Sequence, residues 1–502
     1  MKIQFNYLKY RKWRYLLKNI LIGLITTSLL ITQSFWSDTS IAATGNDYCH
    51  ISKEDIAIKN NLRKNYLQGS LDAVSNYQNI LNEHRSFLEN CRKQSWLKNQ
   101  AIWLRLYACD TTPGALEDIL DQLVNKGYNQ VYVEVFYDSQ VLLPANNNPT
   151  PWHSAIDSPR ANNVDMLAKA IEKGHERGLK VYAWLFTMNF GYTYAQRSDR
   201  QGVLAINGRG ENSLSYVPDG SQAFVDPYNQ QARADYSRLV EEVAKRRPDG
   251  ILFDYIRYPR GTGTDSVASR VQDLWIYSNA SRAVLSQRAY NNQGRILIDR
   301  YVRNGYITAQ DIEEVQESYS DETIPLWQGR TPLEWEYEAS PQQLQQKLQL
   351  DLWYLTVAHA AQGIIDFLGA ASTPAQRQGI KTGAVFFPDG NQTVGDTGFD
   401  SRLQPWDKFP SNIEWHPMSY GVCGHSGCIV DLVRRVTQMA NRGVSITPAL
   451  AGDWSNSFNN RPSLENQMQS IHRVLPQINS VSHFAYSWQE PELDRQRKFC
   501  SL

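Results

Sequence analysis

The sequence predicts a (β/α)8 barrel that carries an N-terminal helical pair and a helical insertion after its fourth strand. Two observations predict this fold. From residue 101 onwards strand-like and helix-like segments alternate, and the strand-like segments number eight. These segments cover residues 101–108, 130–136, 180–186, 250–257, 381–388, 413–420, 444–452 and 481–488. A doubly wound open sheet is the competing fold, but the strand count and the missing Gly-rich phosphate loop after the first strand count against it.

The side chains of the first two strand-like segments fit a barrel. Side chains of a strand alternate between its two faces, so the valines of the second segment are expected to face the helices. Tyr132, Glu134 and Phe136 are then expected to face the barrel interior. In the first segment, Trp103 and Arg105 share one face in the same way.

One connection of the predicted barrel is much longer than the others. More than a hundred residues separate Arg257 from Lys381, and helical patterns predict an insertion over about residues 260–340. Thr308 is expected to cap one of its helices, and a long helix is expected before the fifth strand. An insertion that follows a barrel strand lies on the catalytic face of this fold.

The N-terminus predicts export. Basic residues between positions 9 and 18 precede a short apolar stretch and small residues near position 43, so residues 1–43 resemble a secretory signal. An uncleaved membrane anchor is the alternative, although the apolar stretch is short for a bilayer span. We expect a periplasmic, envelope-associated or secreted protein. Residues 44–100 show helical periodicity and predict a helical pair, and residues 101–502 form the barrel with its insertion.

Six cysteines in an exported chain predict disulfides. The expected pairs are Cys49–Cys91, Cys423–Cys428 and Cys109–Cys500. His425 lies between two of these cysteines, so half of a metal site is an alternative there. No second Cys/His pair of matching spacing occurs, which favours the disulfide.

Composition limits the partners of the protein. Lys plus Arg and Asp plus Glu both total 51, and a net charge of zero argues against a nucleic-acid partner. The chain has 14 Trp and 27 Tyr, which suit core and rim packing or a surface on which sugar rings stack. A polysaccharide is therefore the expected partner. No cofactor is expected, and the oligomeric state is left open.

Active sites of (β/α)8 barrels lie at the C-terminal ends of the strands, so polar and aromatic residues there are candidates. The candidates for substrate contact are Arg105, Trp184, Asn189, Arg257, Tyr258, His416, Tyr420 and Trp488. The candidate carboxylates are Glu134, Asp254 and Asp453. No metal site is expected. The segment 389–396 resembles part of a calcium loop but lacks glycine at the sixth position.

Two carboxylates beside aromatic platforms suit the cleavage of a glycosidic bond. One carboxyl protonates the leaving oxygen, and the other attacks the sugar or activates water. Glu134 and Asp254 both come from even-numbered strands, which contribute to the same layer of a barrel. The alternative is a structural ion pair for each acid, with Arg105 or Arg257 as the partner of Asp254. For His416 the alternative is a hydrogen-bonded core residue.

The segment DGILFDYIRYP (249–259) resembles the signature of the glycosyl hydrolase-like family 10, a bacterial group of exported barrels. AIWLRLY, GYNQVYVEVFYDSQVLLP and IEWHPMSY are similar to its first, second and sixth strands, and the similarity covers roughly residues 101–490. The resemblance implies glycoside hydrolysis in the cell envelope, and some relatives act on peptidoglycan glycan strands stripped of their peptides. It implies that Asp254 is a catalytic carboxylate whose loop is shaped by Arg257 and Tyr258.

The sequence departs from this family pattern at Tyr255, where members commonly have a second acid. Many barrel glycosidases carry a nucleophile on strand seven, and Asp453 is the nearest acid here. The second carboxylate, and with it a retaining or an inverting outcome, is therefore left open. A carbohydrate-binding barrel without catalysis, with Asp254 in a structural ion pair, is one rival hypothesis. A protein-binding scaffold of the envelope is another.

Overall fold

The computed structural model describes residues 48–218 and 220–500, and the predicted signal segment lies outside them. Eight parallel strands form a barrel in the order β11-β8-β6-β5-β2-β1-β13-β12. Their bounds are β1 Asn99–Leu104, β2 Gln130–Tyr137, β5 Lys180–Phe186, β6 Gly250–Asp254, β8 Lys381–Phe386, β11 Glu414–Pro417, β12 Ala449–Ala451 and β13 Ser480–Phe484. Each strand falls within or next to a predicted segment, so the predicted barrel is confirmed.

The two ends of this strand order meet and nearly close the barrel. Trp415 of β11 bridges to Ile446 and Met418 bridges to Ala449 of β12, both in the parallel sense. The backbone N–H of Trp415 also donates to the carbonyl of Ser445 at 2.8 Å. These bridges exclude the open doubly wound sheet.

Amphipathic helices cover the outside of the barrel, and their boundaries follow capping signals. The covering helices are α4 Ala115–Asn125, α5 Met166–Glu176, α8 Gln230–Lys245, α12 Pro341–Arg377, α13 Gly427–Met439 and α14 Leu464–Val474. The side chain of Asn229 caps α8 by accepting from the N–H of Ala232 at 3.0 Å. Gly127 follows α4 with φ +82°, where a Cβ would overlap the carbonyl of Cys49. No helix in the described part of the chain is long and apolar enough to span a membrane.

Aromatic rings fill the barrel interior. The ring of Trp103 lies 5.0 Å from that of Tyr132 and 4.8 Å from that of Trp184, both edge to face. The indole N–H of Trp103 donates to the hydroxyl of Ser482 at 3.1 Å. The middle of the barrel is therefore a packed, largely aromatic core.

Phe136 lies on the other side of the sheet from its expected position. The pairing of β2 with β5 shifts register between Glu134 and Phe136, as at a β-bulge. This shift turns Phe136 outwards, where its ring lies 4.5 Å from Trp152 and 6.3 Å from Tyr236 of α8. The expectation that Phe136 faces the interior is therefore wrong, whereas that for Tyr132 is confirmed by its contact with Trp103.

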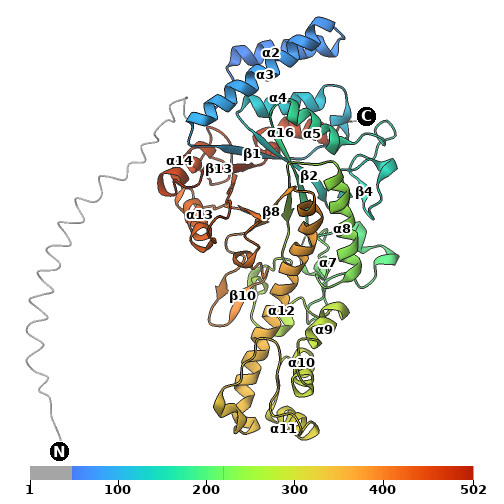
Figure 1. Cartoon of the computed structure of the whole chain (residues 1–502), viewed down its shortest axis with the longest axis vertical. Coiled ribbons are helices and arrows are strands. Elements are labelled where there is room, and N and C mark those ends of the chain that lie inside the picture. The colour runs from blue at the N-terminus through green and yellow to red at the C-terminus, as the bar shows by residue number, and fades with distance from the viewer. Residues whose placement is uncertain (1–47, 219, 501–502) are drawn as a thin grey trace, which may run out of the picture. The chain divides into compact units, whose positions relative to one another are not determined.

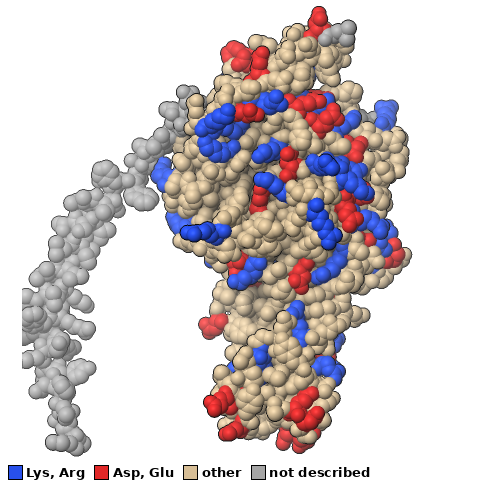
Figure 2. Space-filling view, in the orientation of Figure 1, with Lys and Arg blue, Asp and Glu red and all other residues tan. Residues whose placement is uncertain are grey.

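A helical insertion separates β6 from α12, as predicted. Its helices are α9 Asn279–Ser286, α10 Asn292–Asn304 and α11 Ala309–Ser318, and in Figure 1 they extend away from the strands beside α12. Thr308 and Asp311 form the expected cap of α11, because the N–H of each residue is bonded by the side chain of the other, at 2.7 and 3.1 Å. Figure 2 shows lysines and arginines interspersed with acidic residues over the visible face, as the balanced composition predicts.

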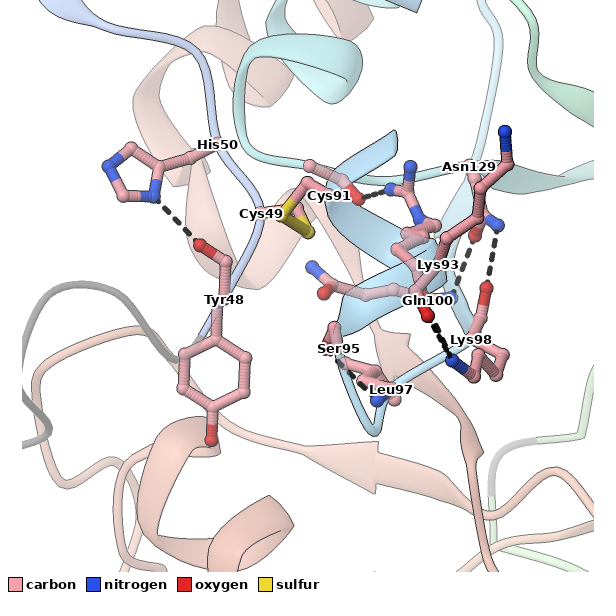
Figure 3. Close-up of a disulfide and its surroundings, with 12 residues drawn as sticks. Tyr48, Cys49, His50, Cys91, Lys93, Ser95, Leu97, Lys98, Gln100 and Asn129 are labelled. Atoms are coloured by element: carbon pink, nitrogen blue, oxygen red, sulfur yellow. Dashed lines mark hydrogen bonds between the residues drawn. A yellow bond between two sulfur atoms is a disulfide. The ribbon is translucent and has the colours of Figure 1, made fainter. Parts of the chain in front are cut away.

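Two helices, α2 Lys53–Leu67 and α3 Leu71–Gln94, precede the barrel. A disulfide joins Cys49, just before the start of α2, to Cys91, near the end of α3. Figure 3 shows Cys49 bonded to Cys91 next to the chain that leads into β1. There the side chain of Asn129 donates to the carbonyl of Lys98 at 3.0 Å. All three expected disulfides are present, which confirms the predicted pairing.

A buried carboxylate, Asp121 of α4, attaches these two helices to the barrel. Its side chain is fully buried and accepts hydrogen bonds from Arg63 at 2.7 Å and from Arg177 at 2.9 Å. The hydroxyl of Tyr77 donates to it at 2.7 Å, and the ammonium of Lys59 lies 3.8 Å away. Burial lowers the pKa of Lys59 to about 8, although the charge of Asp121 opposes this shift. One acid therefore joins side chains of α2, α3, α4 and the end of α5.

We expect Asp121→Asn to lower the free energy of unfolding by about 3–5 kcal/mol, because the surrounding cations lose their buried counter-charge. Urea unfolding followed by circular dichroism measures the loss. Asp118→Asn is the matched control, because Asp118 lies one turn earlier on α4 and pairs with the same Arg63, but is 45% exposed. That change should cost less than about 1 kcal/mol. Equal losses of unfolding free energy in the two variants would show that Asp121 stabilises the fold no more than the exposed Asp118 does.

Candidate active site

A cavity of about 240 Å³ lies at the carboxyl ends of β1, β2, β5 and β13. Two further helices, α15 Tyr486–Gln489 and α16 Pro491–Lys498, contribute to its wall. Its polar and aromatic lining includes Arg105, Glu134, Trp184, Trp488, Asp494 and Lys498. Four residues that the sequence singled out, from four different segments, therefore meet in one cavity.

Glu134 is the buried acid of this cavity, with 1% of its surface exposed. One carboxylate oxygen, Oε2, pairs with the guanidinium of Arg105, which also lies 4.1 Å from the centre of the Tyr137 ring. The other oxygen, Oε1, is buried and has no hydrogen-bond partner among the described residues. Burial raises the pKa of Glu134 despite Arg105, and the charge of Asp254 acts in the same direction. Glu134 is therefore charge-paired on one side only.

Asp254 ends β6 and is 6% exposed. The indole N–H of Trp184 donates to its Oδ2 at 3.0 Å, and the N–H of Tyr255 donates to its Oδ1 at 2.7 Å. Burial raises the pKa of Asp254 to about 6, against the effect of these two hydrogen bonds and of Arg257. Among the described residues, no cation lies within ion-pair distance of Asp254. The ion-pair alternative therefore describes Glu134 but not Asp254.

The loop after Asp254 is held by stacked groups. Tyr255 has φ +54°, and its ring lies 4.1 Å from that of Phe186. The guanidinium of Arg257 lies 4.7 Å from the ring centre of Tyr255 and 5.3 Å from that of Phe224. Tyr255, at the position of the second family acid, thus supports the loop and bonds Asp254 through its backbone. Arg257 is buried in the same stack, so it supports this loop as well.

Two residues that the sequence predicted to contact the substrate, Tyr258 and Asn189, instead form hydrogen bonds to the backbone of the protein. Tyr258 is fully buried and its hydroxyl donates to the carbonyl of Ala360 in α12 at 3.3 Å. The side-chain oxygen of Asn189 accepts from the backbone N–H of Gly191 at 3.2 Å and of Ala223 at 2.9 Å. Both side chains fasten loops on the carboxyl side of the barrel, so the geometry gives no support to direct contact with a substrate.

His416 lies deep in the barrel. It is 1% exposed, and its Nε2 is 3.6 Å from a carboxylate oxygen of Glu414. Burial acts to raise the pKa of Glu414, but His416 and Lys381 lower it to about 2. His416 therefore lies beside an acid in the interior, as a core residue would, but neither of its ring nitrogens has a hydrogen-bond partner among the described residues.

Tyr420 follows β11, which lies two strands along the barrel from β6, the strand that ends in Asp254. Burial raises the pKa of its hydroxyl well above the usual value, and the charge of Asp254 adds to this shift. Its ring lies 5.6 Å from that of Phe484, which itself lies 5.6 Å from Trp488 and lines the cavity. Tyr420 is thus connected to the cavity wall through Phe484, whereas Trp488 lines the cavity itself.

Asp453 lies apart from the two buried acids. Its Oδ1 accepts from the N–H of Trp454 at 2.7 Å, and the indole of Trp454 donates to Tyr128 at 3.1 Å. Tyr128 belongs to the core between strands and helices, so the chain turns outwards after β12. In the described residues no contact joins Asp453 to Glu134 or Asp254, and its expected role as their partner has no geometric support.

Sequence reasoning missed the part of the cavity that comes from α16. Asp494 and Lys498 line the cavity although they lie more than 350 residues from Glu134 in the chain. The one available signal was the expected pairing of Cys109 with Cys500, which brings α16 to the loop after β1.

The described residues include no group of three or more His, Cys, Asp or Glu side chains that could hold a metal ion. In the calcium-like segment, Asp389 pairs with Arg402 at 3.0 Å. Cys423 and Cys428 are bonded to each other, so the half-site around His425 is excluded in this form of the protein.

Comparison with known proteins agrees with this picture of the barrel. Residues 93–288 match the family model of glycosyl hydrolase-like 10, which confirms the resemblance over that range. Glycosyl hydrolase DigH of Escherichia coli K12 is 26% identical over 189 residues, which are 34% of this chain and 40% of DigH. The chain thus aligns with less than half the length of the curated relatives that it matches. These findings support a glycosidase-like protein.

Two of the similar solved structures are glycosidases of distant sequence. The tandem GH20 modules of the pneumococcal exo-beta-D-N-acetylglucosaminidase StrH share 11% identity, with a TM-score of 0.40 and coverage of 81% of this chain and 84% of that one. The beta-N-acetylhexosaminidase of Bacteroides fragilis shares 10% identity, with a TM-score of 0.39 and coverage of 80% and 64%. These values are too low to transfer any chemistry.

The raised pKa of Asp254 predicts that ionising this acid costs stability. The pKa of Asp254 is about 6 in the fold against 3.8 ordinarily. Below pH 3.8 the carboxyl is protonated in both the folded and the unfolded chain, and the free energy of unfolding then falls as the pH rises from 3.8 through 6. We therefore expect Asp254→Asn to be more stable than the wild type at pH 8, by about 1–3 kcal/mol, and close to it at pH 4. Urea unfolding at the two pH values measures the difference.

The partly exposed Asp453 provides the control for this experiment, because Asp453→Asn should show no such gain at pH 8. A wild type that is more stable than Asp254→Asn at pH 8 would instead identify Asp254 as a structural ion-pair partner.

Proposed function

We propose that this protein is an exported glycoside hydrolase of a cell-envelope polysaccharide, with peptidoglycan glycan strands stripped of peptides as the first substrate to test. The observation that carries the proposal is a pair of buried carboxyls: Glu134 lines an aromatic cavity on the carboxyl side of the barrel, and Asp254 is bonded to Trp184 of the cavity lining. The family match and the likeness to DigH support the same class of reaction.

Asp254 suits the general acid. A carboxyl with a pKa of about 6 keeps its proton to a higher pH than an ordinary aspartate and can give it to the leaving glycosidic oxygen. Trp184 fixes the orientation of this carboxyl through its indole N–H. Asp254 then regains a proton from solvent, into which the proton of the attacking water is finally released, so that one water is consumed for each bond cleaved.

Glu134 suits the second carboxylate. Arg105 pairs with one oxygen and favours the ionised form against the effect of burial, and the other oxygen has no partner among the described residues. A carboxylate in this state can stabilise the positive charge that develops on the sugar ring, or can take a proton from the attacking water. The hydroxide equivalent adds to the anomeric carbon as the bond to the leaving oxygen breaks.

The aromatic lining suits a sugar ring. Trp184, Phe484 and Trp488 contribute flat apolar faces beside polar groups, and this combination binds the faces and the hydroxyls of a pyranose together. A chain with zero net charge is also better matched to a polysaccharide than to a nucleic acid. Three disulfides agree with an oxidising compartment outside the cytoplasm, and with the signal expected over residues 1–43.

A carbohydrate-binding barrel without catalysis is the second candidate. Two observations favour it: Tyr255 replaces the second acid of the family pattern, and Glu134 already has a counter-ion in Arg105. In that case the same cavity would bind the glycan and release no product.

The test is hydrolysis of peptide-free glycan strands by the purified protein, with release of reducing ends as the readout. We expect Asp254→Asn and Glu134→Gln each to lower kcat/KM by about 100-fold or more, since each removes a group that transfers or stabilises charge. Asp453→Asn should keep nearly full activity, because Asp453 lies apart from the cavity.

Glycan binding without product by the wild type would favour the second candidate. Full activity of Asp254→Asn would instead remove Asp254 from the chemistry and require another general acid.

A further inference from the structure

Helix α16 forms one wall of the candidate active site. Asp494 and Lys498 of this helix line the cavity together with Arg105 and Tyr107 from the segment after β1. Asp494 is 9% exposed, and the hydroxyl of Tyr107 donates to its Oδ2 at 3.1 Å. The wall is therefore attached to the segment that carries Arg105, the counter-ion of Glu134.

Arg497 connects α16 to both ends of this segment. Its Nε and Nη2 donate to the two carboxylate oxygens of Asp110 at 2.9 and 2.6 Å. Its Nη2 also donates to the carbonyl of Arg105 at 2.8 Å. The rings of Tyr107 and Tyr486 each lie 5.2 Å from the guanidinium carbon of Arg497. A single planar guanidinium thus holds the start and the end of residues 105–110.

The segment itself is stiffened around Asp110. Asp110 is 2% exposed, and its Oδ2 also accepts from the N–H of Tyr107 at 2.8 Å. The carbonyl held by Arg497 and the guanidinium that pairs with Glu134 belong to the same residue, Arg105. A shift of this backbone therefore moves the counter-charge away from Glu134.

The Cys109–Cys500 disulfide anchors the same arrangement covalently. It joins the residue next to Asp110 to a residue just after α16, across 391 residues of sequence. Reduction by a dithiol would add two electrons and two protons to this bond and give two thiols, while the dithiol becomes its own disulfide. Arg497 would then keep its hydrogen bonds, ion pairs and ring contacts, but the helix that carries it would lose its covalent link to the segment after β1.

We propose that α16 is a working part of the candidate active site, in which Arg497 is a positioning residue for Arg105 and the Cys109–Cys500 disulfide secures its position. The proposal rests on the function proposed above and adds to it a means of regulation: reduction of one disulfide weakens the site. The ionisation of Glu134 reports this role directly, and it can be measured whether or not the protein hydrolyses a glycan.

The first test compares Arg497→Ala, Arg497→Lys and Arg495→Ala in the full chain. Arg497→Ala should lower kcat/KM by about 100-fold, because a small displacement of reacting groups costs about this much. It should also raise the pKa of Glu134, measured from its ¹³C-labelled carboxyl by NMR. Arg497→Lys should recover part of both effects, because lysine keeps the charge but not the planar fork. Arg495→Ala, on an exposed position of the same helix, should change neither.

The second test uses the disulfides. Cys109→Ser with Cys500→Ser, or dithiothreitol acting on the wild type, should shift the pKa of Glu134 in the same direction and lower activity. The pair Cys423→Ser and Cys428→Ser is the matched control, because that disulfide lies outside the cavity lining. It should leave both quantities unchanged.

An unchanged pKa of Glu134 in Arg497→Ala would overturn the proposal, even if the melting temperature fell. If the wild type hydrolyses no glycan but the pKa shifts as expected, the proposed function fails while the positioning role of Arg497 stands.

Discussion

The candidate site depends on an imbalance of charge between two nearby buried carboxyl groups: Glu134 is paired with Arg105, whereas in the described part of the chain no cation lies at ion-pair distance from Asp254. Asp254 is instead bonded by the N–H groups of Trp184 and Tyr255. A buried carboxylate without a cation retains its proton to a higher pH than usual, and burial raises the pKa of Asp254 to about 6. The aromatic rings that exclude water therefore also set the protonation of the acid. Burial by these rings thus both stabilises the packing of the site and raises the pKa of Asp254.

The sequence was sufficient for the barrel, and for the interior position of its acids, because both depend on short-range patterns. Apolar segments separated by amphipathic helices predict eight strands, and alternation within a strand places Tyr132 and Glu134 inside. The same reasoning failed at Phe136, where a shift in register reverses the alternation. The local sequence does not predict such a shift, because it arises from the pairing of two strands that are distant in the chain.

Residues beyond a strand end were harder to place. Tyr258 and Asn189 follow strands directly, but a loop has no periodicity that tells an inward side chain from an outward one. Their neighbours in the fold decide the matter, and α12 covers Tyr258. Asp453 also follows a strand, but the chain turns away from the mouth of the barrel there, where the indole of Trp454 bonds to Tyr128. The contribution of Arg497 depends on contacts across almost the whole chain, which only the spacing of the cysteines indicated.

The barrel closes through isolated bridges between β11 and β12, and this has a consequence for how the molecule moves. A boundary with few backbone hydrogen bonds opens more readily than its neighbours, so amide hydrogen exchange should start there. In the ring of strands, the seam lies across from the junction of β2 and β5, which carries Glu134 and Trp184. Local opening is therefore expected on the side of the barrel away from Glu134.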